Sequence, residues 1–186
     1  MAVMGWAAVA TGFAVVALAF LGFFRDPDRT APDLPGAVLA PADGRVMVIT
    51  EALDPWVGAA VRVSIFLSPL DVHVNRAPIG GLVKNVEYVV GRFLAAYRPE
   101  ASEQNERCAM SLDGDRARLT VTQISGVLAR RIVCRARPGE TLRAGERYGL
   151  IRFGSRTDLV LPRGTDLRVQ VGDRVRGGES VMGVLR

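Results

Sequence analysis

Beyond residue 36, the sequence consists of short apolar segments separated by glycine, proline and polar turns. The segment VRVSIFL at residues 61–67 begins with alternating apolar and polar residues, as a strand with one buried face does. Residues 118–124 and 127–136 are typical of paired strands, and no segment in this part of the chain has long helical periodicity. The pattern predicts a mainly β fold.

A weak internal repeat narrows the fold class further. GETLRAGE at residues 139–146 aligns with GDRVRGGE at residues 172–179, at an offset of 33 residues. Each copy has the pattern of a turn that leads into a short strand. The repeat is similar to the hammerhead repeats of biotinyl- and lipoyl-type modules, which implies a barrel-like β sandwich. Such modules present a modifiable lysine at a hairpin, and neither copy contains a lysine.

The N-terminal segment, residues 1–24, contains no charged side chain. As a helix it would be about 36 Å long, whereas the hydrocarbon core of a bilayer is about 30 Å thick. The basic start of a cleaved signal peptide is missing, so we expect an uncleaved apolar helix that either spans the membrane or lies in one leaflet. Arg25 and Arg29 follow it, and this positive charge predicts that the rest of the chain lies at the cytoplasmic face of the cell membrane.

The remaining sequence divides into a linker and one domain. Residues 25–36 hold three prolines and five charged side chains, which predict an extended linker. Residues 37–186 are long enough to bury one hydrophobic core, and we expect them to form the catalytic domain.

Composition limits the chemistry that this domain can perform. Its only lysine is Lys84, without a surrounding motif, so we expect no pyridoxal phosphate. Its only histidine is His73, which excludes a three-histidine metal site, and we expect no metal. Cys108 and Cys134 match no disulfide or metal motif, and we expect both to be reduced. The net charge of +5 suits an anionic lipid surface, and no nucleic-acid motif is present.

Gly154 and Ser155 form a candidate self-cleavage site after an apolar strand. Gly154 lacks a Cβ and can adopt strained conformations, while the Ser155 hydroxyl is the nearest nucleophile to its carbonyl. Attack would convert the amide to an ester, and elimination would then cut the chain and leave a pyruvoyl group on the new N-terminus. The alternative is a Gly-Ser turn between two strands. The Gly-x-Ser-x-Gly elbow of serine hydrolases is absent.

Four blocks in order carry a resemblance over nearly the whole chain: FFRDP at residues 23–27, PADG at 41–44, FLSPLDVHVNR at 66–76 and FGS at 153–155. Together they resemble the short-form phosphatidylserine decarboxylase proenzymes. The resemblance implies cleavage between Gly154 and Ser155 into a β chain (residues 1–154) and an α chain (residues 155–186), which pair as a heterodimer. It also implies a pyruvoyl cofactor made from Ser155, and decarboxylation of phosphatidylserine to phosphatidylethanolamine through a Schiff base.

The resemblance also implies roles for individual side chains. In the family, an aspartate of the PADG block and a histidine of the SPxD block assist the serine, and by position these are Asp43 and His73. We expect Asp43 to orient His73, which deprotonates Ser155 and later moves protons during decarboxylation. Asp71 is the second choice for the aspartate.

One position departs from the long-form pattern. Long-form members have a second histidine where this chain has Arg76, so the proton transfers fall to His73. Arg76 and Asn75 are candidates for binding the substrate, with Arg76 contacting a phosphate or carboxylate through its planar fork. Arg92 is a further candidate for head-group contact, and surface positions are the alternative for Asn75 and Arg92.

Two other functions fit parts of the sequence. A decarboxylase of a related ether-type serine phospholipid would need the same motifs, because none of them contacts the lipid tails. A non-catalytic binding module would fit the hammerhead-like repeat. The expected partners are phosphatidylserine and anionic membrane lipid, and the number of copies in an assembly is left open.

Overall fold

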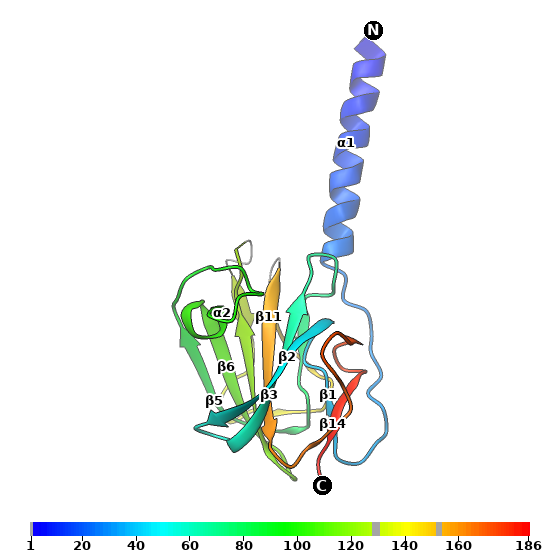
Figure 1. Ribbon diagram of the computed structural model, residues 1–186. Coiled ribbons are helices and arrows are strands. Elements are labelled where there is room, and N and C mark those ends of the chain that lie inside the picture. Colours follow the sequence, from blue (N-terminus) through cyan, green and yellow to red (C-terminus); the bar gives the residue numbers. More distant parts are fainter. Residues whose placement is uncertain (1, 128–130, 152–153) are drawn as a thin grey trace.

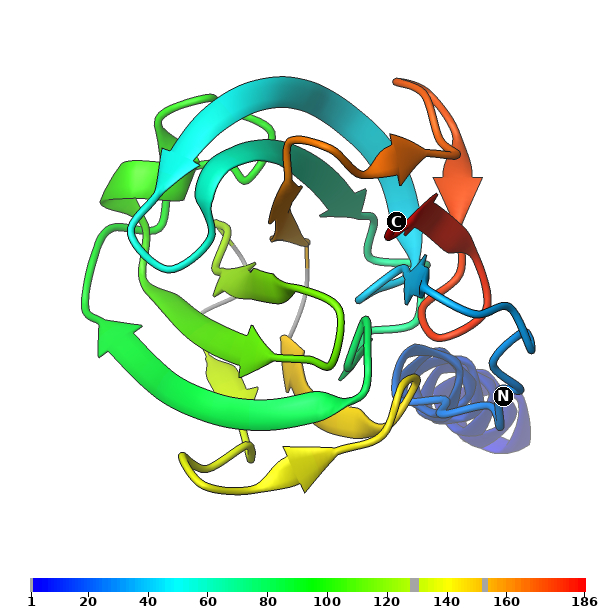
Figure 2. The same cartoon turned by 90° about the horizontal axis from the view of Figure 1, so that it is seen from below.

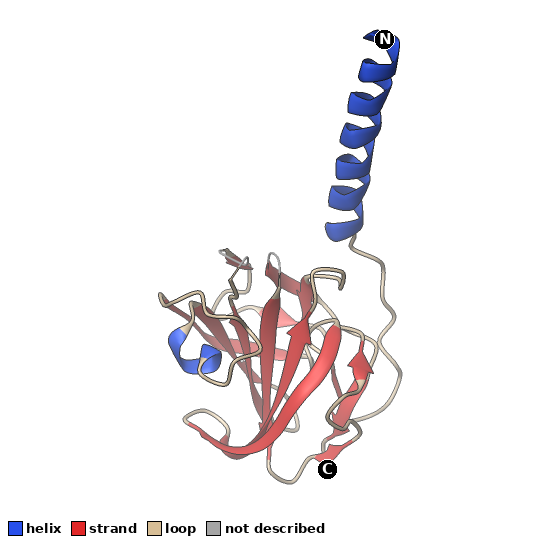
Figure 3. Ribbon diagram, turned by 45° about the horizontal axis from the view of Figure 1, so that its top comes forward, coloured by secondary structure: helices blue, strands red, loops and turns tan. Residues whose placement is uncertain are grey.

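The structure is a computed structural model of the 186-residue chain, and it describes residues 2–127, 131–151 and 154–186. One helix, α1 (Ala2–Phe23), projects from a domain made almost entirely of strands (Figure 1). Residues 24–36 run in extended form from α1 along the side of the domain to its first strand (Figure 3). The mainly β fold predicted from the sequence is confirmed.

The main sheet has eight antiparallel strands. It curls around the domain axis, as the view from below shows (Figure 2). In order across the sheet, its strands are β13 (Arg174–Val175), β2 (Gly44–Asp54), β3 (Gly58–Leu67), β11 (Ser155–Pro162), β7 (Arg118–Ile124), β6 (Arg107–Asp113), β5 (Gly81–Val89) and β9 (Thr141–Leu142).

Two three-stranded sheets complete the domain. One has the order β1 (Ala37–Leu39), β14 (Val181–Val184), β12 (Asp166–Leu167), and the other β4 (Val74–Arg76), β10 (Arg147–Ile151), β8 (Ile132–Cys134). A short helix, α2 (Ala101–Gln104), lies in the connection between β5 and β6. Among the residues that the structure describes, no helix is both long and apolar enough to cross a membrane.

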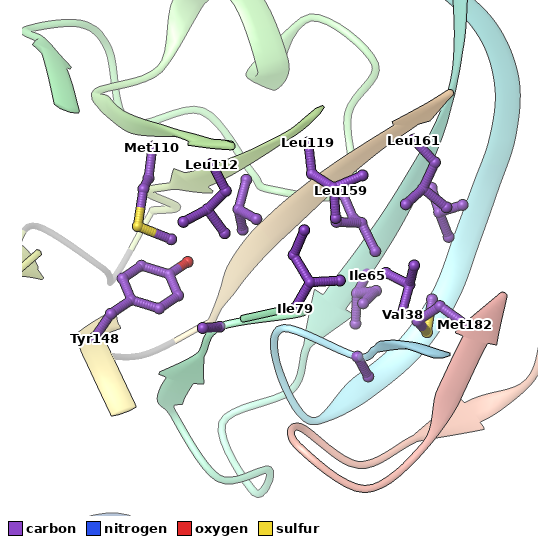
Figure 4. Packing of buried hydrophobic residues seen from close by; sticks show 14 of the residues in the cluster. Val38, Ile65, Ile79, Met110, Leu112, Leu119, Tyr148, Leu159, Leu161 and Met182 are labelled. Carbon is purple, nitrogen blue, oxygen red and sulfur yellow. The ribbon is translucent and has the colours of Figure 1, made fainter. Parts of the chain in front are cut away.

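The hydrophobic core lies between the curled sheet and the two small sheets. Alternation produces it: along β6, every second residue is buried, including Met110 and Leu112. Val38 of β1, Met182 of β14 and Tyr148 of β10 belong to the same cluster (Figure 4). Burial of these apolar side chains, at about 25 cal/mol per Å² removed from water, holds the three sheets together.

The two copies of the sequence repeat make matching backbone hydrogen bonds. Each copy places its first glycine at positive φ, +90° at Gly139 and +100° at Gly172. Each copy then makes three matching backbone bonds of 2.8–2.9 Å to an earlier segment: Gly139 N–Val83 O, Val83 N–Glu140 O and Gly145 N–Ala77 O in the first, and Gly172 N–Val46 O, Val46 N–Asp173 O and Gly178 N–Ala40 O in the second. The likeness to hammerhead modules stays a prediction.

Candidate active site

Ser155 is the first residue of β11, a central strand of the main sheet. It pairs with Leu67 of β3, and Arg156 beside it pairs with Ile124 of β7. Its side chain is fully buried, and Oγ has no hydrogen-bond partner among the described residues. A buried polar atom without a partner costs about 1–3 kcal/mol, so burial of this hydroxyl lowers the stability of the fold.

Gly154 precedes it in the left-handed region, with φ of +57°. Only glycine adopts this conformation without steric cost, so the sequence expectation of an unusual backbone at this bond agrees with the geometry. The carbonyl oxygen of Gly154 packs closely against Gly126, which follows β7. Phe153, the first residue of the FGS block, lies outside the described residues.

His73 lies in the loop between β3 and β4 and is 4% exposed. Its Nδ1 lies 2.8 Å from the Asp71 carbonyl oxygen. A carbonyl only accepts hydrogen bonds, so Nδ1 carries the proton and Nε2 presents a lone pair. Nε2 is buried and has no partner among the described residues. The ring also packs against Phe23 at the end of α1, at a centroid distance of 4.4 Å.

Burial lowers the pKa of His73 below the ordinary value of 6.5, because a charged imidazolium loses its hydration. The Asp71 carbonyl and carboxylate oppose this shift of the pKa, and the positive charge of Arg25 adds to it. His73 is therefore neutral at pH 7, which is the form that a general base requires.

Backbone contacts bring His73 and Ser155 to the same end of the sheet. The His73 carbonyl accepts a hydrogen bond of 3.1 Å from the Ile151 amide, four residues before Ser155. Leu67, the strand partner of Ser155, is the last residue of β3, directly before the loop that carries His73. The structure therefore places these two predicted site residues at the same end of the sheet, and Ser155 Oγ and His73 Nε2 are not hydrogen-bonded to each other.

Asp43 has other partners. Its carboxylate accepts hydrogen bonds from Arg29 at 2.9 Å and from the Gly177 amide at 2.8 Å. Burial is the largest effect and raises the pKa of Asp43 above its ordinary value. The bonds from Gly177 and Arg29 act in the opposite direction, and the nearby charge of Asp71 adds to the increase. In this structure the carbonyl of Asp71 is the partner of His73 Nδ1, and orientation of His73 by Asp43 stays a prediction.

Asn75 and Arg76 are held by structural contacts. Asn75 is fully buried and links β4 to β11 and β7, through bonds to Thr157 Oγ1 (3.1 Å) and from Gln123 Nε2 (2.9 Å). Arg76 donates to the Gly145 carbonyl and to Asp26 and Pro27 in the linker. Burial lowers its pKa. Contact of either side chain with a substrate stays a prediction.

A cavity of about 850 Å³ lies between the linker, the His73 loop and the second repeat copy. It is lined by Asp43 and by Leu70, Asp71 and Val72 just before His73. Arginines from two segments also line it: Arg25 and Arg29 of the linker, and Arg174 and Arg176 of the second repeat copy. Arg174 and Arg176 are largely exposed at its rim. The cavity thus borders the residues just before His73, while His73 and Ser155 are not among the described residues that line it.

Two features near Ser155 were not predicted from the sequence. The first is the approach of Gly126 to the Gly154 carbonyl. The second is a buried ion pair on β11, in which Arg156 Nε donates to Asp158 Oδ1 at 2.6 Å. The only signal for the pair was the opposite charge two residues apart on one strand, which places both side chains on the same face. Among the described residues, no cluster of three or more His, Cys, Asp and Glu could hold a metal ion.

Fold and site thus describe a mainly β protein with a fully buried serine at the start of a central strand, directly after a left-handed glycine. The sequence model of the family described as Phosphatidylserine decarboxylase matches residues 16–183.

Curated relatives extend this match. A protein of Chlorobium chlorochromatii, named Phosphatidylserine decarboxylase proenzyme, is 48% identical over 174 residues, which is 92% of this chain and 82% of the relative. Proteins with the same name from Nocardia farcinica and Desulfotalea psychrophila are 50% and 47% identical, and cover 91% of this chain and 74% and 81% of their own lengths. The chain therefore belongs to the phosphatidylserine decarboxylase family, and the resemblance read from its motifs is confirmed.

Proposed function

We propose that this protein decarboxylates phosphatidylserine to phosphatidylethanolamine and carbon dioxide, after cutting its own chain between Gly154 and Ser155. The relatives are named phosphatidylserine decarboxylase proenzymes, and this name supports both the decarboxylation and the self-cleavage. The observation that carries the proposal is the buried Ser155 hydroxyl, which has no hydrogen-bond partner among the described residues and directly follows the left-handed Gly154. A Gly-Ser turn at the protein surface would leave the hydroxyl in water, whereas this one is fully buried.

The cleavage begins at the Ser155 hydroxyl. His73 Nε2 accepts its proton, Oγ bonds to the Gly154 carbonyl carbon, and the C–N bond breaks as the nitrogen gains a proton. The resulting ester joins Gly154 to Ser155 through Oγ. Loss of the Ser155 Cα proton then breaks the Cβ–Oγ bond, and one water molecule is consumed as ammonia leaves. The products are a carboxylate on Gly154 and a pyruvoyl group at residue 155.

The residues around Ser155 fit a pyruvoyl group, because position 155 is buried at a strand start with the base-competent His73 at the same sheet end. A pyruvoyl group supplies a carbonyl that condenses with a primary amine and withdraws electrons from the bond to the departing carboxylate. The proton that replaces the carboxylate would come from solvent by way of His73, whose Nε2 would take it up and pass it to the substrate carbon while Phe23 packs against the ring. Arg174 and Arg176 at the cavity rim would pair with the lipid phosphate.

The two chains would remain together after cleavage. The α chain, residues 155–186, contains β11, β12, β13 and β14. Three of these pair with strands of the β chain: β11 with β3 and β7, β13 with β2, and β14 with β1. Only the pair of Ser155 with Leu67 adjoins the bond that is cut, and the other pairs of these ladders lie farther from it, so a stable heterodimer follows from the sheet pairing.

The protein would lie at the cytoplasmic face of the cell membrane, held by α1. Apolar side chains on this helix point into solvent, with Trp6 75%, Phe13 73% and Leu21 71% exposed. Exposed apolar surface of this extent is costly in water and is removed by insertion among lipid chains. Arg25 at the base of the helix suits anionic head groups.

Replacing Ser155 tests the function. Ser155→Ala is expected to remain one uncut chain and to release no carbon dioxide from carboxyl-labelled phosphatidylserine in detergent micelles, because the nucleophile and pyruvoyl precursor are lost. Ser125→Ala is the matched control, because Ser125 is also fully buried and its hydroxyl has no hydrogen-bond partner in the described part of the chain. It is expected to cut and to turn over substrate at close to the wild-type rate. An active Ser155→Ala protein would end the pyruvoyl proposal.

A further inference from the structure

The end of β7 lies beside the bond that is cut. The last described pair between β7 and β11 is Ile124 with Arg156. Continuing this antiparallel register by two residues places Gly126 opposite Gly154. Neither glycine belongs to the described ladder, so the contact between them lies just beyond the paired strands.

Gly126 has no room for a side chain. A Cβ built on it would overlap the Gly154 carbonyl oxygen and would lie 3.3 Å from both the Gly154 carbonyl carbon and the Ala96 Cβ. The backbone of Gly126 is not in the left-handed region that favours glycine. Glycine is therefore required here because a side chain would collide with its neighbours. Ala96 is buried, at 3% exposed, and leaves little freedom on the other side.

The segment that carries Gly126 is firmly anchored. The Ser125 amide donates to the Glu106 carbonyl at 2.9 Å. The Ser125 carbonyl accepts a bond of 2.8 Å from Asn105 Nδ2, and the Asn105 side chain also bonds both backbone groups of Leu94. Asn105 is fully buried. Gly126 is therefore a fixed surface against which the Gly154 carbonyl rests.

We propose that Gly126 is a positioning residue for self-cleavage, because its bare Cα provides the surface that fixes the Gly154 carbonyl for attack by Ser155 Oγ. During attack the carbonyl carbon becomes tetrahedral and its oxygen gains negative charge. A carbonyl that is free to rotate rarely meets the nucleophile in the right direction, and small misplacements of reacting atoms cost large factors in rate. This role rests on the proposed function, since it concerns the same bond.

The test follows the conversion of one chain into two, by intact mass, in full-length protein made by in vitro translation. Gly126→Ala is expected to slow the conversion by about a hundredfold or more, as a displaced carbonyl would. The matched control is Gly164→Ala, where an added Cβ meets no atom within 4 Å and the glycine is not left-handed. This control and the wild type are expected to convert at equal rates.

A second readout separates positioning from a general effect on the fold. Hydroxylamine cuts the Ser155 ester but not the amide, so it reports whether attack on Gly154 has occurred. Gly126→Ala is expected to show no hydroxylamine-sensitive ester while melting within a few degrees of uncut Ser155→Ala. Conversion at the wild-type rate, or a folded variant that accumulates the ester, would overturn the role of Gly126.

If Gly126→Ala does not fold, Ala96→Gly combined with Gly126→Ala makes room on the far side of the added methyl group. This double variant is expected to convert more slowly than Ala96→Gly alone, and equal rates would overturn the role. The proposed function fails separately: an active wild-type protein that stays uncut contradicts the cleavage itself, whatever Gly126→Ala does.

Discussion

Nδ1 of His73 is hydrogen-bonded to the Asp71 carbonyl, whereas Nε2 is buried and has no partner among the described residues. The first contact fixes the tautomer, and burial keeps the ring neutral by lowering its pKa. Both effects arise from the short loop between β3 and β4, which turns the ring inward beneath Phe23. The ring is thereby held in the neutral form that the proposed proton transfer from Ser155 requires.

The lowered pKa of His73 predicts the pH dependence of cleavage. The neutral form accepts the proton, so the rate should be constant through neutral pH and should fall only below the ordinary histidine value of 6.5. Below the lowered pKa, the rate should drop about tenfold per pH unit, as the base becomes protonated. The measurement is the rate of conversion to two chains between pH 4.5 and 8.5.

Two phenylalanines of α1 provide the matched pair for this prediction. Phe23→Ala opens the His73 ring to water and should move the fall in rate to higher pH, toward the unperturbed value, because desolvation is the main cause of the shift. Phe20 is 53% exposed, and Phe20→Ala should leave the profile unchanged. A wild-type profile that falls between pH 7 and 8, or identical profiles for the two variants, would contradict this account of His73.

Helix α1 connects the apolar N-terminus to the site through its last residues. Phe23 packs against His73, and Arg25 just beyond the helix donates to the Leu70 carbonyl at 2.7 Å. Farther along, the side chains of Phe13 and Leu21 are mostly exposed. The linker is held separately by ion pairs, including Arg147 with Asp26 and Asp28. The helix thus projects from a domain whose strands do not depend on it.

Removing most of α1 tests its role. A chain without residues 2–22 is expected to lose nearly all binding to vesicles of phosphatidylcholine and phosphatidylglycerol, because the exposed apolar surface is gone. It should still cut itself, since Ser155, His73 and Gly126 belong to the remaining domain. Co-sedimentation with the vesicles measures the first result. Undiminished sedimentation would place the main membrane contact on the β domain instead.

The whole chain shows which features can be predicted from sequence. Alternation at residues 61–67 predicted strand β3, and the strand expected at residues 118–124 is β7, because side-chain period is local information. The expected pairing of residues 118–124 with 127–136 was wrong, because β7 pairs with β6 and β11, and β8 pairs with β10 in another sheet. The 33-residue repeat predicted two similar turns, and their glycines adopt the same positive φ. Strand order was not predictable, because β11 lies between β3 and β7 through pairings of distant segments.

In the site too, local motifs were predictable from the sequence, whereas contacts between distant segments were not. Ser155, Gly154 and His73 came from motifs, and the structure places them at one end of the sheet. The contact of Gly126 with Gly154 could not be foreseen, because it depends on the register between β7 and β11. The partners of Asp43 were likewise set by tertiary packing, which brings Gly177 and Arg29 to its carboxylate.

The intact mass of the purified wild-type protein under denaturing conditions tests the central claim most directly, because it needs no substrate. Cleavage at Gly154–Ser155 predicts two chains, residues 1–154 and 155–186, the second lighter by one ammonia than a peptide that begins with serine. A single uncut chain in a preparation that decarboxylates phosphatidylserine would mean that Ser155 is a buried strand residue and not the source of the cofactor.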